Sequence, residues 1–256
     1  MLPFIHVLNR DVPMYGIMLA LGFVLVSVIS FFRAIKRGLK GENLIIIAAF
    51  VLGFALIGGK LTYTFVTWSP AEIIHMVNQG DWENLLGGGI VFYGGLISGI
   101  IGAFLGSLVA KDDLRNYLDV VVPVIPLGHA IGRIGCLCAG CCYGRPTDSI
   151  IGIVYPQNIG GAPVGVKLLP VPLFECTVNL MIFGVLMYVS AKTSSRYLTC
   201  ILYCILYGIA RFILEFFRYD TIRGIAGGLS TSQWISLGLI AGAIIMLFIL
   251  KKYRRA

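Results

Sequence analysis

The sequence predicts an all-helical integral membrane protein that crosses the bilayer about seven times. Of its 256 residues, 58% are hydrophobic and only 12% are charged, whereas soluble domains average about 45 to 50% apolar and about 25% charged residues. A helix of about 20 apolar residues covers roughly 30 Å of hydrocarbon and satisfies its own backbone hydrogen bonds there. Several stretches reach this length, so we expect a single membrane domain over residues 1–256.

Seven apolar stretches are expected to form the spans. Basic residues follow the first stretch and no small-residue cleavage site is present, so we expect a retained span rather than a signal peptide. No internal repeat of the inverted-transporter kind is visible, which disfavours a transporter. The expected spans are residues 14–32, 44–66, 89–110, 118–138, 171–190, 199–217 and 230–250.

Basic residues divide unequally between alternating connections. The positive-inside rule places the connections with twelve of them in the cytoplasm, against five on the other side, so the N-terminus is expected outside and the C-terminus inside. The long connections at about 67–88 and 139–170 then lie outside. The formal charge of +8 arises between apolar runs, which indicates contact with lipid headgroups rather than nucleic acid. The cytoplasmic set is Arg33, Lys36, Arg37, Lys40, Lys111, Arg115, Lys192, Arg196, Lys251, Lys252, Arg254 and Arg255, and the outer set is Arg10, Arg145, Lys167, Arg218 and Arg223.

The fourth span carries ionisable residues that an apolar helix does not keep by default. His129, Arg133 and Cys136 are spaced four and three residues apart and share one helical face. A charge inside a span costs several kcal/mol, so such residues usually face a cavity or a partner. The plainer alternatives are that Arg133 extends to the nearby interface and that His129 is a hydrogen-bonded bundle residue.

The sixth span carries a second polar stripe. Tyr207, Arg211 and Glu215 are four residues apart, and Arg218 follows three residues later. The planar guanidinium of Arg211 suits a phosphate group. The structural alternative is that Glu215 forms an ion pair that joins helix ends.

Glycine-flanked tyrosines begin two other spans. Tyr93 precedes Gly94 and Gly95, and Tyr15 precedes Gly16. An aromatic residue at this depth is as often part of the interfacial belt as of a functional site.

Four of the seven cysteines crowd into residues 136–142. The spacing of Cys136, Cys138, Cys141 and Cys142 is not the separated pair of Cys-x-x-Cys motifs typical of structural zinc, so no metal ligand is assigned. Inert packing, disulfides and a thiolate activated by Arg133 stay open, with Cys136 and Cys141 as candidates for a thiol role. We expect Cys176, Cys200 and Cys204 to be helix-packing residues.

These motifs resemble the prolipoprotein diacylglyceryl transferases of bacterial inner membranes over most of the chain. Gly132-Arg133-Ile-Gly135 through Gly144 is similar to the family signature, and Tyr207 to Arg218, followed by Ser230-x-x-Gln233, is similar to its C-terminal motif. Tyr15-Gly16, Tyr93-Gly94-Gly95-Leu and Leu173-Phe174-Glu175 resemble shorter segments. The departures are Tyr93, where the family has histidine, Cys136, Ala139 and Cys141, which replace two asparagines and a glutamate, and Lys60, where arginine is usual.

The resemblance implies transfer of the diacylglyceryl group of phosphatidylglycerol to the thiol of a lipobox cysteine in a prolipoprotein signal peptide, with release of glycerol phosphate. The implied location is the bacterial cytoplasmic (inner) membrane, with the site toward its outer face and no cofactor. Arg133 and Arg211 are the expected phosphate clamp. Either His129 or Tyr93 is the base, and His129 is favoured because a tyrosine of pKa about 10 is a poor base near neutrality. The expected substrate-binding residues are Tyr15, Gly94, Gly95, Gly132, Gly144, Tyr207, Glu215, Arg218 and Gln233.

Two other functions fit the same residues. The first is a related lipid transferase with a different acceptor, such as another peptide, a glycan or a small thiol. The second is a membrane protein without enzymatic activity that binds lipid or performs thiol redox chemistry through the clustered cysteines.

Overall fold

A computed structural model describes residues 3–7, 10–193, 197–219 and 224–253. Within them, seven helical segments are long and apolar enough to cross a membrane, which confirms the predicted fold class. Every predicted span end lies within four residues of the observed one. The orientation of the termini stays a prediction, and four of the basic residues counted for it lie outside the described residues, namely Arg196, Arg223, Arg254 and Arg255.

The chain divides into two compact units, one formed by Met1–Ser30 with Leu118–Ala256 and the other by Phe31–Tyr117. Each is described by itself, and the prediction of a single membrane domain stays a prediction. The helices are α1 (Met14–Lys36), α2 (Gly41–Thr67), α3 (Pro70–Gln79), α4 (Trp82–Leu86), α5 (Phe92–Ala110), α6 (Leu114–Val121), η1 (Val122–Val124), α7 (Ile125–Ala139), α8 (Val171–Lys192), α9 (Leu198–Leu214), η2 (Glu215–Phe217) and α10 (Thr231–Tyr253).

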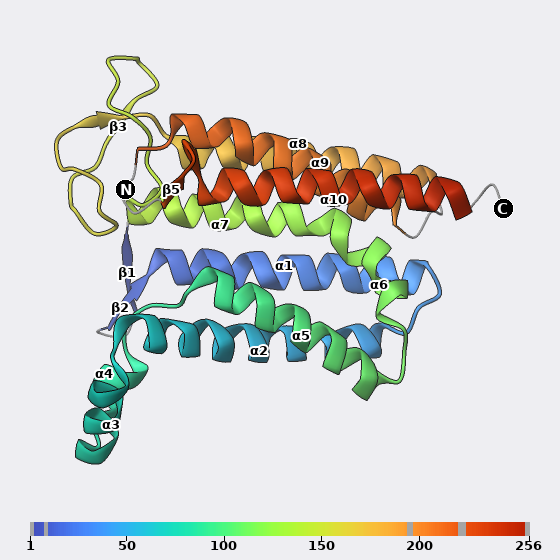
Figure 1. The fold of residues 1–256 in the computed structure, drawn as a ribbon, viewed down its shortest axis with the longest axis horizontal. Coiled ribbons are helices and arrows are strands. Elements are labelled where there is room, and N and C mark those ends of the chain that lie inside the picture. Colours follow the sequence, from blue (N-terminus) through green and yellow to red (C-terminus); the bar gives the residue numbers. More distant parts are fainter. Residues whose placement is uncertain (1–2, 8–9, 194–196, 220–223, 254–256) are drawn as a thin grey trace. The chain divides into compact units, whose positions relative to one another are not determined.

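In the first unit, α7, α8, α9 and α10 lie side by side as a bundle (Figure 1). Helices α7 and α9 end, and α8 and α10 begin, at the same end of this bundle. The first part of α1 packs closely on α7, because a Cβ added at Gly22 would lie only 3.0 Å from the carbonyl oxygen of Gly128. Glycines allow this close approach of two helices inside a membrane.

The fourth span is not one continuous helix, as we had predicted over residues 118–138. It consists of α6, a 3-10 turn (η1) and α7. Pro123 lies in the turn and Pro126 follows at the second position of α7. Proline lacks an amide hydrogen and clashes with the preceding turn, which explains why the helix breaks here.

The segment between α7 and α8 folds around a small apolar cluster. Tyr143, Tyr155, Ala162 and Leu168 are buried together, with Ile153 packed against them. Short strands β3 (Ile153–Val154) and β4 (Lys167–Leu168) pair antiparallel, with Ile153 opposite Leu168. The long connection at 139–170 is therefore an ordered structure that lies against the end of the bundle.

Two further hairpins flank α1 and α10. Strands β1 (Phe4–Val7) and β2 (Arg10–Pro13) pair with Phe4 opposite Pro13 and precede α1. Strands β5 (Ile225–Ala226) and β6 (Leu229–Ser230) pair with Ile225 opposite Ser230 and precede α10.

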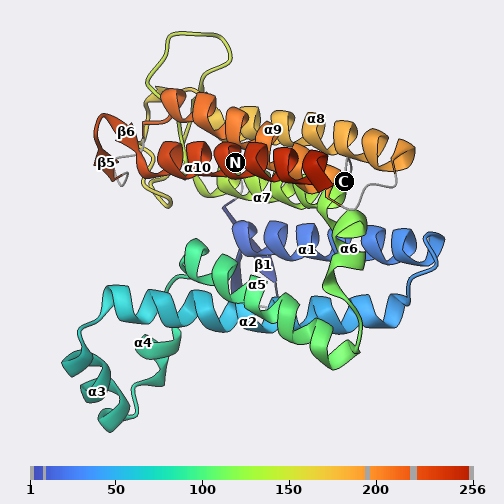
Figure 2. The ribbon, with the colours of Figure 1, turned by 45° about the vertical axis from the view of Figure 1, so that its right-hand side comes forward.

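In the second unit, α5 lies along α2 (Figure 2). Glycines on α5 make this contact: a Cβ added at Gly94 would lie 2.1 Å from Thr62 Oγ1, and one added at Gly102 would lie 2.6 Å from the carbonyl oxygen of Phe50. The predicted long loop at 67–88 contains α3 and α4. Ser69 and Glu72 form a capping box that starts α3 after Thr67, a signal that the sequence analysis did not use.

The Gly102 contact predicts a matched pair of substitutions. Gly102→Ala should destabilise the protein by about 1–3 kcal/mol, because the new methyl group overlaps backbone of α2. Gly53→Ala on α2 should be neutral or stabilising by up to about 1 kcal/mol, because nothing lies within 4 Å of its added Cβ and alanine favours the helix. Thermal unfolding in detergent measures both. Equal midpoints for the two variants would contradict the close packing of α2 and α5.

Candidate active site

The carboxylate of Glu175, in the second turn of α8, joins two arginines from neighbouring helices. Arg133 Nε of α7 lies 2.6 Å from Glu175 Oε2, and Arg211 Nη1 of α9 lies 2.7 Å from Glu175 Oε1. The Glu175 side chain is only 3% exposed, and those of Arg133 and Arg211 are 14% and 11% exposed. The two arginines that the sequence analysis chose are therefore brought together by a carboxylate that it did not choose.

The chain of charges continues to a fourth group and a fourth helix. Arg211 Nη2 lies 2.6 Å from Glu215 Oε2 and donates to Ser232 Oγ of α10 at 2.9 Å. Two guanidinium groups thus alternate with two carboxylates. A buried charge costs several kcal/mol unless it is paired, so this alternation is what allows the four groups to remain inside an apolar bundle. The predicted ion pair of Glu215 is confirmed.

A small cavity lies against these groups. Its lining includes His129, Arg133, Glu175, Asn179, Tyr207 and Arg211. The rings of His129 and Tyr207 are 5.2 Å apart between centroids. His129 of the fourth span and Tyr207 of the sixth, which belonged to separate stripes in the sequence, therefore share one site with both arginines.

Several polar atoms at the cavity keep unused hydrogen-bonding capacity. Among the described residues, Nη2 of Arg133 and Nε of Arg211 have no hydrogen-bond partner. Asn179 Nδ2 donates to the carbonyl oxygen of Glu175 at 2.7 Å, whereas its buried Oδ1 has no partner within the described part of the chain. The site can thus offer two cationic donors and one neutral acceptor to a polar ligand.

The site lies near one end of the bundle. Arg133 is six residues before the end of α7, and Glu175 is four residues after the start of α8. At 1.5 Å per residue, the four charged groups lie within about 9 Å of the helix ends. This depth suits a ligand whose polar part is at the membrane surface and whose apolar part is in the bilayer.

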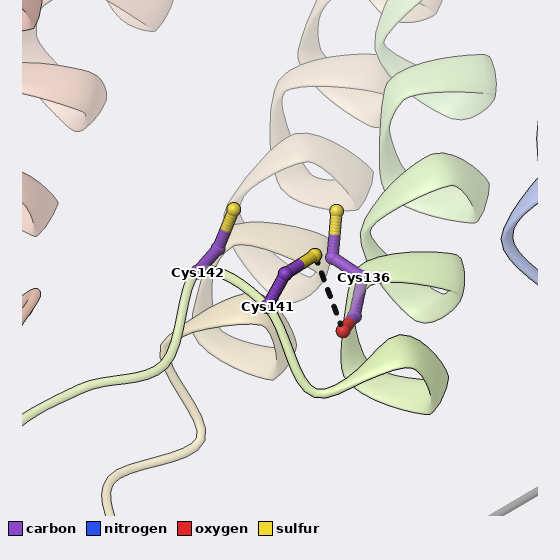
Figure 3. Close-up of side chains that lie close together, drawn as sticks. All are labelled: Cys136, Cys141 and Cys142. Atoms are coloured by element: carbon purple, nitrogen blue, oxygen red, sulfur yellow. Dashed lines mark hydrogen bonds between the residues drawn. The ribbon is translucent and has the colours of Figure 1, made fainter. Parts of the chain in front are cut away.

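Three cysteines gather beside Arg133. The Sγ atoms of Cys136, Cys141 and Cys142 all lie within 4.8 Å of one another, and Figure 3 shows them converging from the end of α7 and the turn after it. Arg133 Nη1 donates to Cys142 Sγ at 3.6 Å. Hydrogen bonds from Cys136 and Cys141, helped by the charges of Arg218 and Arg133, lower the pKa of Cys142, and hydrogen bonds with Cys136 and Cys142 raise that of Cys141.

The other residues predicted in the first unit have these positions. Tyr15 lies beside α7, where a Cβ added at Gly135 would be 3.2 Å from its Cα. Arg218 is buried and pairs through its backbone with Gly144 in an isolated antiparallel bridge. Gly132 is buried in α7. Gln233 caps α10: its Oε1 accepts from the Ser230 amide at 2.9 Å, and Ser230 Oγ accepts from its own amide at 3.2 Å.

Tyr93, Gly94 and Gly95 belong to the second unit and start α5. The glycines have a structural reason there, since a Cβ added at Gly95 would lie 3.1 Å from the carbonyl oxygen of Ala55. The Tyr93 side chain is 45% exposed within the described chain. Roles for these three residues at the site stay predictions.

Sequence reasoning missed Glu175, Asn179 and Ser232 as members of the site. Glu175 had a usable signal, because it is the one acidic residue in the span 171–192 and an acidic residue inside a span normally has a partner. Asn179 follows it by one helical turn. Ser232 had no such signal, because a serine in the first turn of a helix is common and its contact with Arg211 is long-range.

The fold and site together define a multi-pass membrane protein with a buried arginine–carboxylate site at one end of a helix bundle. The profile of the prolipoprotein diacylglyceryl transferase family matches residues 3–249. The chain belongs to this family.

Similar relatives cover nearly the whole chain. A phosphatidylglycerol–prolipoprotein diacylglyceryl transferase 2 of Clostridium perfringens is 35% identical over 91% of this chain and 88% of the relative. The phosphatidylglycerol–prolipoprotein diacylglyceryl transferase of Clostridium tetani is 35% identical over 94% of both chains. One from Dehalococcoides mccartyi is 33% identical over 91% of this chain and 87% of the relative.

The shared carboxylate predicts a large effect of a small change. Glu175→Gln keeps the shape of the side chain but leaves Arg133 and Arg211 without their common anion. Breaking a buried ion pair from one side costs about 3–5 kcal/mol, so we expect a clear fall in the thermal unfolding midpoint in detergent. Glu83→Gln, an exposed residue of α4, is the matched control and should change stability by less than about 0.5 kcal/mol. An unchanged midpoint for Glu175→Gln would show that the carboxylate does not hold the arginines.

Proposed function

We propose that this protein transfers the diacylglyceryl group of phosphatidylglycerol to a cysteine thiol in the lipobox of a prolipoprotein signal peptide. The observation that carries the proposal is the pair of arginines held by Glu175 at a cavity near the helix ends. Relatives with this name cover nearly the whole chain, which supports the same substrates.

The reaction replaces a carbon–oxygen bond by a carbon–sulfur bond. The acceptor thiol loses its proton, and its sulfur attacks the glyceryl carbon that carries the phosphate. The bond from that carbon to the phosphate oxygen breaks, and the oxygen keeps the electron pair. The products are a thioether and glycerol phosphate, so negative charge builds on the leaving phosphate.

The arginines suit the phosphate of this leaving group. Charge-assisted hydrogen bonds from a guanidinium are strongest when the charge develops in a site with little water. The unused N–H groups of Arg133 and Arg211 are the candidate donors, while Glu175 and Glu215 hold the two side chains in place. We propose that the free Oδ1 of Asn179 accepts a hydrogen bond from a headgroup hydroxyl.

His129 is the proposed base. It lines the same cavity as Arg133 and Tyr207, and a neutral imidazole accepts a proton readily. Tyr207, Tyr15 and Gln233 are proposed to orient the headgroup and the acceptor. Cys136 and Cys141 stay candidates for a thiol role in place of the asparagine and glutamate of similar proteins.

The charge asymmetry of the connections supports a location in the bacterial cytoplasmic membrane with the site toward the outer face. By the positive-inside rule, the connection 139–170 is the outer one, and it follows the end of α7 that carries Arg133. Phosphatidylglycerol would then reach the site from the outer leaflet.

The test is glycerol phosphate release from phosphatidylglycerol in the presence of a lipobox peptide. Arg133→Ala should lower the rate by about 10²- to 10³-fold, as loss of one charge-stabilising donor does. Arg133→Lys keeps the charge beside Glu175 but loses the planar fork, so it should restore stability more than activity. Arg115→Ala, an exposed arginine paired with Asp113, is the control and should keep full activity. If the wild-type protein releases no glycerol phosphate with the peptide, the proposed function is wrong. Release with other thiols alone would favour a transferase with a different acceptor.

The base has a separate test. His129→Ala should lower transfer by about 10²- to 10⁴-fold and remove the acidic limb of the pH profile of kcat/KM, with little change in phosphatidylglycerol binding. His75→Ala on α3, whose ring is exposed, is the matched control and should behave as wild type. Full transfer activity in His129→Ala would exclude the imidazole as the base.

A further inference from the structure

Three thiols outside the arginine site form a preformed ligand set. The Sγ atoms of Cys136, Cys141 and Cys142 lie within 4.8 Å of one another. A Zn–S bond is about 2.3 Å long, so tetrahedral geometry requires sulfur atoms about 3.8 Å apart. Small rotations of the three side chains therefore suffice to surround a single ion.

The backbone brings these thiols together by a reversal at the end of α7. Gly140 closes the helix in a left-handed conformation with φ of 72°, and the amide of Cys141 donates to the carbonyl oxygen of Cys136 at 3.2 Å. Cys142 also has a positive φ of 58°, which is unusual for a residue with a side chain. The turn thus returns Cys141 and Cys142 to the last turn that carries Cys136 (Figure 3).

The surroundings favour an anionic complex. Arg133 Nη1 lies 3.6 Å from Cys142 Sγ and 4.0 Å from Cys136 Sγ. Arg218 also interacts electrostatically with Cys142. Three thiolates and one Zn²⁺ carry a net charge of −1, which these guanidinium groups stabilise.

We propose that Cys136, Cys141 and Cys142 bind one Zn²⁺ ion as thiolates and leave its fourth position open to water or to an added ligand. Binding releases the thiol protons to the solvent. Within the described residues, no other His, Cys, Asp or Glu side chain joins the group. Three protein ligands with one open position are typical of catalytic rather than structural zinc. The proposal departs from the sequence analysis, which assigned no metal ligand because the local spacing is unlike that of zinc motifs.

The test uses the full-length protein in detergent, purified with a non-thiol reductant and without oxygen. We expect one Zn²⁺ per chain by elemental mass spectrometry after removal of loosely bound metal. Replacement by Co²⁺ should give a thiolate-to-cobalt charge-transfer band, and an added small thiol should change the ligand-field bands by filling the fourth position. Absence of zinc from the reduced wild-type protein, after incubation with Zn²⁺, would overturn the proposal. Ligand-field bands that do not respond to the thiol would overturn the open position.

Single substitutions identify the ligands. Cys142→Ser should weaken Zn²⁺ binding by more than about 10- to 100-fold, the loss seen when only an outer partner of a ligand is removed. Cys138→Ser, four residues away and outside the group, is the matched control and should bind as wild type. Equal affinity of the two variants would overturn the assignment, as would intact-protein mass spectrometry that shows a disulfide within the group under these reducing conditions.

The metal site and the proposed transfer reaction can be told apart in the same samples. Zinc binding without glycerol phosphate release would leave the metal site standing and remove the proposed function. Release from a protein that binds no zinc would do the reverse.

Discussion

The carboxylate of Glu175, held between Arg133 and Arg211, is the interaction on which the polar site depends. Two guanidinium groups of like charge repel each other and are expensive to bury in an apolar bundle. One carboxylate oxygen for each arginine, at 2.6 and 2.7 Å, removes both problems. Glu215 extends the balance to four groups of alternating sign, and Ser232 brings α10 into the same network.

This network also explains why the site is built from helix ends. Apolar spans can slide and rotate against one another with little change in buried apolar contact, whereas charged partners within 3 Å define the relative depth of α7, α8 and α9. Because the charges lie close to the ends of these helices, the arginines can be both buried and near a polar surface. A lipid phosphate needs a site of this kind, since its headgroup is wet and its acyl chains are not.

Arg133 belongs to two neighbourhoods at once. Its Nε is paired with Glu175, while its Nη1 faces the sulfur atoms of Cys136 and Cys142. Any change in the charge of the thiols therefore acts directly on one of the two groups proposed to hold the phosphate. The replacement of an asparagine and a glutamate by Cys136 and Cys141 places new chemistry next to the arginine site, without disturbing the helix that carries Arg133.

The sequence by itself determined the seven spans, because hydrophobic length is a local property and every predicted end lies within four residues of the observed one. It also identified Arg133, Arg211 and Glu215 as out of place in apolar helices, because a charge there is costly wherever it points. Only the tertiary structure decided how these groups are paired. The partner of both arginines, Glu175, is 42 residues from one and 36 from the other, and a distance in space across helices leaves no periodic trace in the chain. The same holds for the cysteines: their spacing looked unlike a metal motif until the reversal at Gly140 placed three sulfur atoms together.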